Sequence, residues 1–230
     1  MQITDVQALA VRATRHYPTI IGAARLDPEA HRLHDRSDFI LIHVATDSGH
    51  VGLGEVSDLP EGMRLPDGAA ATAPRVEALL RDRLVGMDPF ALEALQERMT
   101  VRSPSGSEPV ESRMLTCAVD AALFDLMGKA AALPAYQLCG GLVRSDVSVS
   151  YVAFIREPDL LAREIEQQVA GGFWAFKLKV GLDPERDVRA LRLAREIAGD
   201  GASIKLDANG AWSVDEAIEI LRRMERDHPA

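Results

Sequence analysis

The hydrophobic pattern at the start of the chain predicts β-structure. Apolar and polar residues alternate along residues 2–13, QITDVQALAVRA, as they do in a half-buried strand. Two further β-rich runs within residues 37–56 flank the turn sequence TDSG at residues 46–49, which predicts a hairpin. The polar stretch before this hairpin, residues 17–37, has the length of a functional lid, although an ordinary surface loop fits the pattern equally well.

After the hairpin the apolar spacing becomes helical. Residues 71–84 and 89–100 each show the spacing of an amphipathic helix. Residues 111–131 are rich in alanine and apolar on most sides, so we expect a long buried helix. This helix contains Asp120 and Asp125, and because buried carboxylates need partners, we expect both to be structural.

Strands and helices alternate after the double glycine at residues 140–141. The predicted strands cover residues 147–154, 173–180 and 202–209. The predicted helices cover residues 158–170, 184–198 and about 214–226, the last with Ser213 as its N-cap. Three such alternations predict parallel βαβ units.

The second of these strands, FKLKVG, has two unlike faces. Alternate residues of a strand share a face, so Lys177 and Lys179 project together, away from the apolar residues between and around them. A half-buried strand with a solvated face is the ordinary interpretation. The alternative is a strand that lines a polar cavity. The third strand repeats the pattern, with Lys205, Asp207 and Asn209 on its polar face.

Four of these polar residues fall at the carboxyl ends of their predicted strands, where parallel sheets carry their chemistry. Asp207 and Asn209 offer oxygen ligands that suit Mg²⁺. Lys177 and Lys179 suit two tasks, holding a substrate carboxylate and acting as a base. Lys205 lies one pleat deeper, and we expect it to be structural and paired with a carboxylate.

Composition narrows the class of protein. Apolar residues make up 47% of the 230 residues and charged residues 27%, which is normal for one or two globular domains. The net charge of −9, without a basic run, argues against a nucleic-acid partner. Cys117 and Cys139 are too few for a disulfide framework, and we expect buried thiols. With neither a signal peptide nor an apolar run of membrane-spanning length, a cytoplasmic protein with no membrane partner is expected.

Three motifs in order, AVDAALFDLMGKAAALPAYQLCGG, FKLKVG and LDANGAW, resemble the enolase superfamily in its mandelate racemase and muconate lactonizing enzyme branch. The resemblance covers nearly the whole chain. It implies an α+β capping domain, residues 1–140, followed by residues 141–230 as the first part of an α/β barrel of the modified TIM type. About three βα units of that barrel are expected.

The resemblance also implies a chemistry: Mg²⁺-dependent abstraction of the proton α to a carboxylate, through an enediolate. Lys179 resembles the base, and Lys177 resembles its electrostatic helper near the carboxylate of a small-molecule substrate. Asp207 resembles a metal ligand, and Asn209 resembles the neighbouring residue that contacts substrate or metal. The loop at residues 17–37 matches the region that closes over the substrate. Racemisation or epimerisation, cycloisomerisation and dehydration all remain open.

The length of the chain departs from the family pattern. The family takes further metal ligands from later strands, and a full barrel needs about 250 residues. We therefore expect an incomplete Mg²⁺ site, and a chain that is the N-terminal part of a longer enzyme and inactive alone. The alternative is a non-catalytic fragment that associates with itself. Three strands would leave an unpaired sheet edge and bare apolar surface, which supports the interpretation as part of a longer enzyme. A homo-oligomer is also expected.

Overall fold

The structure, a computed structural model, describes residues 1–20, 34–56, 68–100 and 110–227. The chain forms two compact units, one of Met1–Thr14 and Arg36–Ser145, the other of Arg15–Asp35 and Asp146–Ala230. Most of the predicted lid, residues 21–33, lies outside the described residues, so its role stays a prediction. The division into domains at residues 140 and 141 also stays a prediction.

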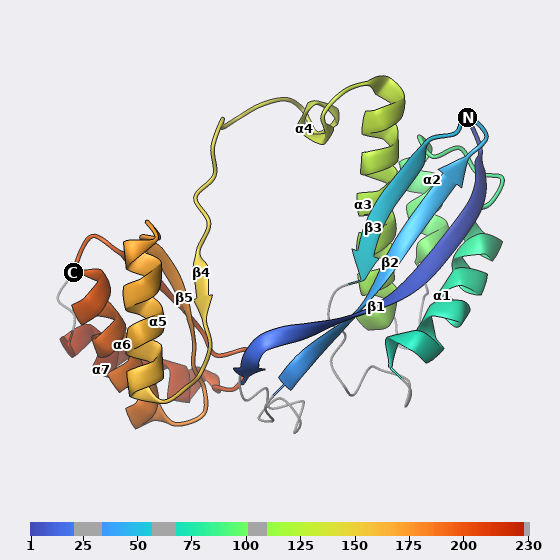
Figure 1. The fold of residues 1–230 in the computed structure, drawn as a ribbon. Helices are drawn as coiled ribbons and strands as arrows, with labels where there is room; N and C mark the ends of the chain where they lie inside the picture. Colours follow the sequence, from blue (N-terminus) through green and yellow to red (C-terminus); the bar gives the residue numbers. More distant parts are fainter. Residues whose placement is uncertain (21–33, 57–67, 101–109, 228–230) are drawn as a thin grey trace. The chain divides into compact units, whose positions relative to one another are not determined.

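The first unit is built on a three-stranded sheet with the order β1-β2-β3 (Figure 1). The strands are β1 (Ile3–Thr19), β2 (His34–Thr46) and β3 (Val51–Val56). β2 and β3 pair antiparallel, with Ile42 opposite Gly54, so the predicted hairpin is confirmed. β1 continues several residues beyond the strand predicted from its alternation.

Four helices accompany this sheet: α1 (Ala69–Leu84), α2 (Leu92–Met99), α3 (Val110–Ala131) and the short α4 (Ala135–Leu138). α2 begins three residues later than predicted. α3 runs along β3 (Figure 1), and the glycines of β3 allow its close approach. A Cβ atom on Gly54 would lie 1.9 Å from the carbonyl oxygen of Ala118. The core of the unit includes Ile3, Val6, Ile40, Ile42, Val44, Leu80, Leu84, Leu95, Ala122 and Leu123.

α3 is buried on one side only, which corrects the expectation of a helix buried all round. Its side facing β3 includes Leu126, which is fully buried, whereas Cys117 is exposed. Cys139, after α4, is exposed as well, so the prediction of buried thiols was wrong. Asp125 accepts a hydrogen bond from the Leu53 backbone N–H at 2.9 Å and pairs with Lys129.

Asp120 also has a structural partner, because its carboxylate accepts hydrogen bonds from the Gln96 side chain at 3.2 and 3.3 Å. That contact joins α3 to α2. Both acidic residues therefore stabilise packing in this unit.

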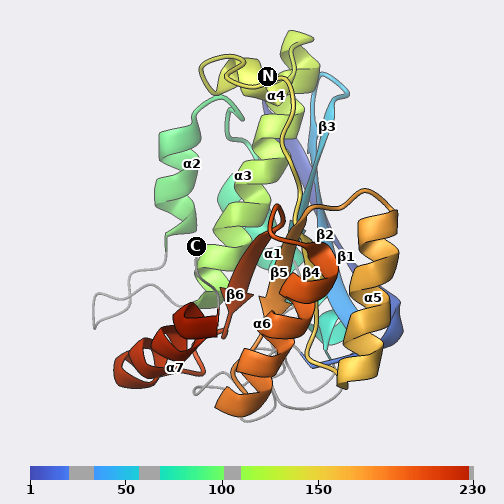
Figure 2. The same ribbon diagram turned by 90° about the vertical axis from the view of Figure 1, so that its left-hand side faces the viewer.

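The second unit alternates strand and helix around a parallel sheet with the order β4-β5-β6 (Figure 2). The strands are β4 (Tyr151–Ala153), β5 (Ala175–Lys179) and β6 (Ser203–Asp207). The helices are α5 (Pro158–Ala170), α6 (Pro184–Ala198) and α7 (Val214–Asp227). The predicted parallel βαβ units are confirmed. The apolar side of the sheet and the helices share a core of Ala153, Leu161, Ile165, Phe176, Leu178, Val180 and Ala194.

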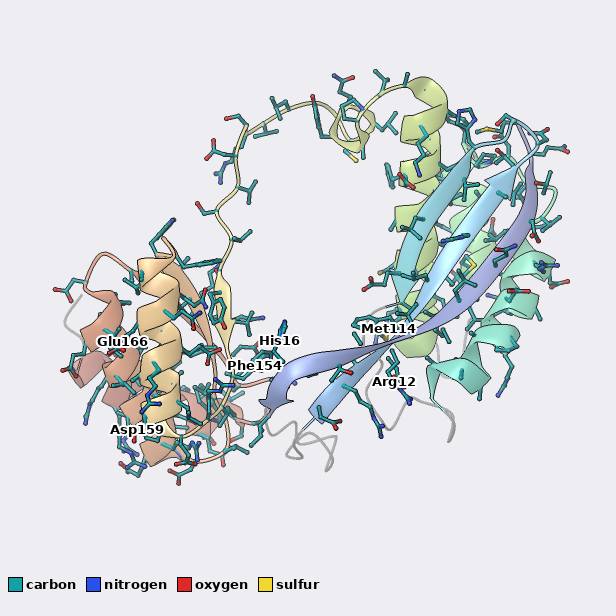
Figure 3. All side chains as sticks on the ribbon, viewed as in Figure 1. Arg12, His16, Met114, Phe154, Asp159 and Glu166 are labelled. Atoms are coloured by element: carbon teal, nitrogen blue, oxygen red, sulfur yellow. The ribbon has the colours of Figure 1, made fainter. Side chains whose placement is uncertain are left out.

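α5 has an exposed side and a buried side. Asp159 and Glu166 lie on the exposed side (Figure 3), while Leu161 and Ile165 are buried. Ser213 caps α7 as predicted, because its hydroxyl accepts from the Glu216 N–H at 3.3 Å and Glu216 accepts from the Ser213 N–H in return. None of the described helices is long and apolar enough to span a membrane.

β4 is shorter than predicted. Residues 147–150 are not part of a strand, and Val147 and Val149 are exposed. Tyr151 pairs with Phe176, the second residue of β5, so the segment before it has almost no paired neighbour. Alternation alone does not make a strand where the backbone lacks a partner.

Candidate active site

The polar ends of β5 and β6 meet because the two strands run parallel and in register. Lys179 lies opposite Asp207, and Lys177 lies opposite Lys205. Phe176 and Leu178 project to the other face, into the core. Burial of these apolar residues therefore fixes which face the lysines occupy.

Two ammonium groups converge on one carboxylate oxygen. The Lys179 Nζ lies 2.8 Å from Oδ2 of Asp207, and the Lys177 Nζ lies 3.3 Å from the same atom. The Lys179 side chain is only 9% exposed, whereas that of Lys177 is 37% exposed. The structure thus brings these three predicted site residues together. A wholly solvated face would not bury Lys179 to this extent.

The Asp207 carboxylate is held in its ionised form. Partial burial raises its pKa. The hydrogen bond and charge of Lys179, the Asn209 N–H and Lys177 lower the pKa by more than burial raises it, so it lies below the ordinary value of 3.8. Oδ1 accepts the Asn209 N–H at 3.0 Å, and Oδ2 faces the lysines. Both oxygens therefore face donors that favour negative charge.

Asn209 reaches Asp207 through its backbone. It adopts φ = 52°, in the left-handed region that asparagine tolerates better than most residues. This turn directs its N–H back to the carboxylate, and the residue itself is exposed. Contact of the Asn209 side chain with substrate or metal stays a prediction.

Lys205 differs from its prediction. Its Nζ donates to the Ser150 hydroxyl at 3.3 Å, so the partner that the structure gives it is a hydroxyl and not a carboxylate. The residue is exposed, one pleat below the Asp207 end of β6. The whole chain has four lysines, Lys129, Lys177, Lys179 and Lys205, and three of them lie on this face of the sheet.

Asp187 is a polar residue near the site that sequence reasoning missed. It lies in α6, is 2% exposed, and accepts the Gly181 N–H at 2.9 Å. Together with Lys179 and Arg156 it lines a cavity of about 320 Å³. In the sequence it looks like one of several acidic residues in the first turn of a helix. Its position directly before Val188, which is buried, was the available signal.

The described residues do not by themselves form a complete Mg²⁺ site. Mg²⁺ takes close to six oxygen ligands and is held by carboxylates together with substrate or water oxygens. The described parts of the chain contain no group of three or more His, Cys, Asp or Glu side chains that could hold a metal ion. Asp207 fits as one ligand, and it is already opposed by two ammonium groups.

Comparison with known families decides the lineage. Residues 10–140 match the mandelate racemase / muconate lactonizing enzyme N-terminal domain, and residues 160–230 match the enolase C-terminal domain-like family. The chain belongs to the mandelate racemase / muconate lactonizing enzyme family. The predicted fold class is thereby confirmed, namely an α+β capping domain followed by the first part of a barrel.

The relatives are about twice as long as the chain. A hydrophobic dipeptide epimerase from Enterococcus faecalis is 31% identical over 193 residues, which cover 83% of this chain and 51% of the relative. The structure of an N-succinyl Arg/Lys racemase from Bacillus cereus matches with a TM-score of 0.81 at 26% identity, over 99% of this chain and 58% of that one. The chain therefore spans about half the length of the curated relatives it matches.

Other relatives indicate the range of reactions in the family. A dipeptide epimerase from Cytophaga hutchinsonii, solved with Mg and the dipeptide D-Ala-L-Val, matches with a TM-score of 0.80 at 28% identity, over 99% of this chain and 57% of that one. The relatives as a group include racemases, epimerases, dehydratases and cycloisomerases. The chain thus comes from a lineage of isomerases and lyases.

Proposed function

We propose that this site abstracts the proton α to the carboxylate of a small-molecule substrate, with Lys179 as the base. The observation that carries the proposal is the buried Lys179 ammonium, 2.8 Å from Asp207 at the carboxyl end of paired parallel strands. The family supports the reaction class, and the dipeptide epimerases among the relatives favour a dipeptide or other N-acyl amino acid as substrate. The product is a racemised, epimerised, cyclised or dehydrated acid.

The arrangement of charges suits this reaction. Removing an α-proton from a carboxylate adds negative charge to the same oxygens, and positive groups fixed beforehand stabilise that charge most in the transition state. Lys177 is the more exposed ammonium, so we assign it to the substrate carboxylate. Lys179, held beside it on the same face, acts as the neutral amine: it first releases its ammonium proton to solvent, and its Nζ then takes the α-proton. Asn209 follows Asp207 at the rim and is assigned to substrate contact.

We further propose that Asp207 contributes one oxygen ligand to Mg²⁺. The metal would supply charge neutralisation at the substrate oxygens. Its other ligands would come from substrate or from groups other than the described residues, because those residues hold no cluster of three such ligands. The 230-residue chain alone is therefore proposed to turn over slowly or not at all.

The predicted cytoplasmic homo-oligomer is part of this proposal. Val214, Ile218 and Leu221 form an exposed apolar stripe along α7, at 76%, 43% and 44% exposure. β6 has one strand neighbour, β5, among the described strands. An unpaired strand edge beside an apolar helix face is typical of a surface that becomes covered.

Uptake of solvent deuterium tests the proposal. The 230-residue chain and any longer protein encoded by the same reading frame, here called the full-length protein, are incubated with Mg²⁺ in deuterated water, with dipeptides, N-acyl amino acids and acid sugars as substrates. Mass spectrometry then measures deuterium at the α-carbon. We expect uptake by the full-length protein and little or none by the 230-residue chain. No uptake by either, together with tight oligomers that do not bind Mg²⁺, would favour the non-catalytic alternative.

A further inference from the structure

The loops that follow β5 and β6 meet beside a buried side chain. One loop leaves Lys179 and contains Gly181, and the other leaves Asp207 and contains Trp212. Asp187, on α6, binds the first of these loops. Its Oδ2 accepts the Gly181 N–H at 2.9 Å, and the Trp212 side chain packs against the buried cluster that contains Val188, the next residue of α6.

Asp187 occupies an environment that is costly for a carboxylate. It is 2% exposed, and burial raises its pKa above the ordinary 3.8; the Gly181 N–H and the Trp212 side chain act in the opposite direction and only partly offset burial. The hydrogen-bond donor that the structure gives it is an uncharged backbone amide. A carboxylate held in this way stabilises a particular loop geometry more than it stabilises the fold as a whole.

The two loops are also packed directly against each other. Gly181 adopts φ = 112°, and a Cβ atom there would lie 2.7 Å from Cβ of Ala211 and 3.1 Å from the carbonyl oxygen of Ala208. The Val180 N–H donates to the Asp207 carbonyl oxygen at 3.1 Å. A shift of either loop would therefore move the strand end that carries Lys179 relative to the one that carries Asp207.

We propose that Asp187 is a positioning residue for the candidate active site. By accepting the Gly181 N–H, it fixes the loop after β5 against Ala208 and Ala211 of the loop after β6, so that the Lys179 Nζ stays within reach of Asp207. This inference rests on the proposed role of Lys179 as the base. Asp187 acts through the loop after β5, since its hydrogen bond goes to Gly181.

The expected effect follows from the sensitivity of catalysis to geometry. A displacement of about 1 Å can lower a rate about 100-fold, even when the changed residue is far from the chemistry. Asp187→Asn removes the charge and replaces one carboxylate oxygen with an NH₂ group, which weakens the hydrogen bond that the Gly181 N–H donates to this side chain. We expect it to lower kcat about 10- to 100-fold in the full-length protein with KM nearly unchanged. Asp187→Ala should lower it further.

Nuclear magnetic resonance on the ¹⁵N-labelled 230-residue chain tests the positioning independently of activity. The chain has two tryptophans and four lysines, so the indole and ammonium regions are simple. In Asp187→Asn, the Trp212 indole signal should shift, and the Lys179 ammonium signal should broaden as its pairing with Asp207 loosens. The indole of Trp174, which is 55% exposed, should not change.

Asp183→Asn is the matched control. Asp183 caps the same helix by accepting the Arg186 N–H at 2.8 Å, and asparagine is an equally good cap, so charge is removed while the loop contacts remain. Both signals should stay as in the wild type. Gly181→Ala provides a second route, because its Cβ forces the loops apart without touching Asp187.

An unchanged Lys179 ammonium signal in Asp187→Asn and in Gly181→Ala would overturn the proposal. If the full-length protein takes up no deuterium at all while the signals move as expected, the positioning holds and the proposed function is the part that fails. The two outcomes are therefore distinguishable.

Discussion

Lys177 and Lys179 are two residues apart, yet the fold gives them different environments. Both project from the polar face of β5, but Lys179 at the strand end is 9% exposed and Lys177 is 37% exposed. The more buried amine lies closer to Asp207, and the more exposed one faces outward, where a substrate would arrive. This difference between equivalent side chains is what separates a base from a binding group in the present account.

At the residue scale, Asp207→Asn should weaken Mg²⁺ binding to the full-length protein by about tenfold or more, because the change removes a charged oxygen ligand. Isothermal titration calorimetry measures the affinity directly. Asp183→Asn, which removes a carboxylate from the exposed start of α6, serves as the control and should leave the affinity unchanged. Equal Mg²⁺ affinity in wild type and Asp207→Asn would refute the ligand assignment.

Asp125 leads to a prediction about pH. Burial raises its pKa, but Lys129 and the Leu53 N–H lower it more, so the folded pKa lies below the ordinary 3.8. The stability that it contributes is therefore fully present above about pH 4 and is lost as the pH falls through the lowered value. The Leu53 amide shift should titrate with a midpoint below 3.8, and this titration should vanish in Asp125→Asn. A midpoint above 3.8 would contradict the assignment.

At the scale of elements, the contact between β3 and α3 depends on the absence of side chains. Gly52 and Gly54 face α3, and a Cβ on either would lie within about 2 Å of a helix carbonyl oxygen. The alternation of glycine with larger residues in VGLGEV is thus a packing signal, with one face of the strand left bare for the helix. Sequence reasoning predicted the strand and the helix, but not their close approach.

Gly54→Ala should therefore destabilise the first unit by about 1–3 kcal/mol, because β3 and α3 must separate to admit the methyl group. Urea denaturation followed by far-UV circular dichroism measures the free energy of unfolding. Gly201→Ala is the control, since a Cβ there meets nothing within 4 Å, and it should change stability by less than about 0.5 kcal/mol. Equal stability of the two variants would show that the contact is looser than described.

At the scale of the whole molecule, the order of the strands and helices along the chain was predicted better than the length of each element. The alternation of elements after Gly141, the hairpin and the ends of α5 and α6 follow from periodicity, caps and glycines. The length of β4 was overestimated because pairing, and not alternation, decides where a strand begins. Asp187 was missed because its burial depends on the loop after β5 folding back onto the first turn of α6, which the helical pattern alone does not show.

The candidate site was also predicted only in part. Strand periodicity was enough to place Lys177, Lys179 and Asp207 on one polar edge. It could not show that one oxygen of Asp207 faces both lysines, that Asn209 acts through its backbone, or that Lys205 binds a hydroxyl. Those details depend on side-chain length and turn conformation, which become fixed only when neighbouring strands are in register.

Deuterium exchange by Lys179→Ala tests the central claim most directly. In the full-length protein with Mg²⁺ and an active substrate, uptake at the α-carbon should fall at least about 100-fold, as expected for loss of a general base. Lys205 lies on the same face of the sheet but binds the Ser150 hydroxyl, so Lys205→Ala should exchange at nearly the wild-type rate. Uptake by Lys179→Ala at the rate of Lys205→Ala would contradict the account.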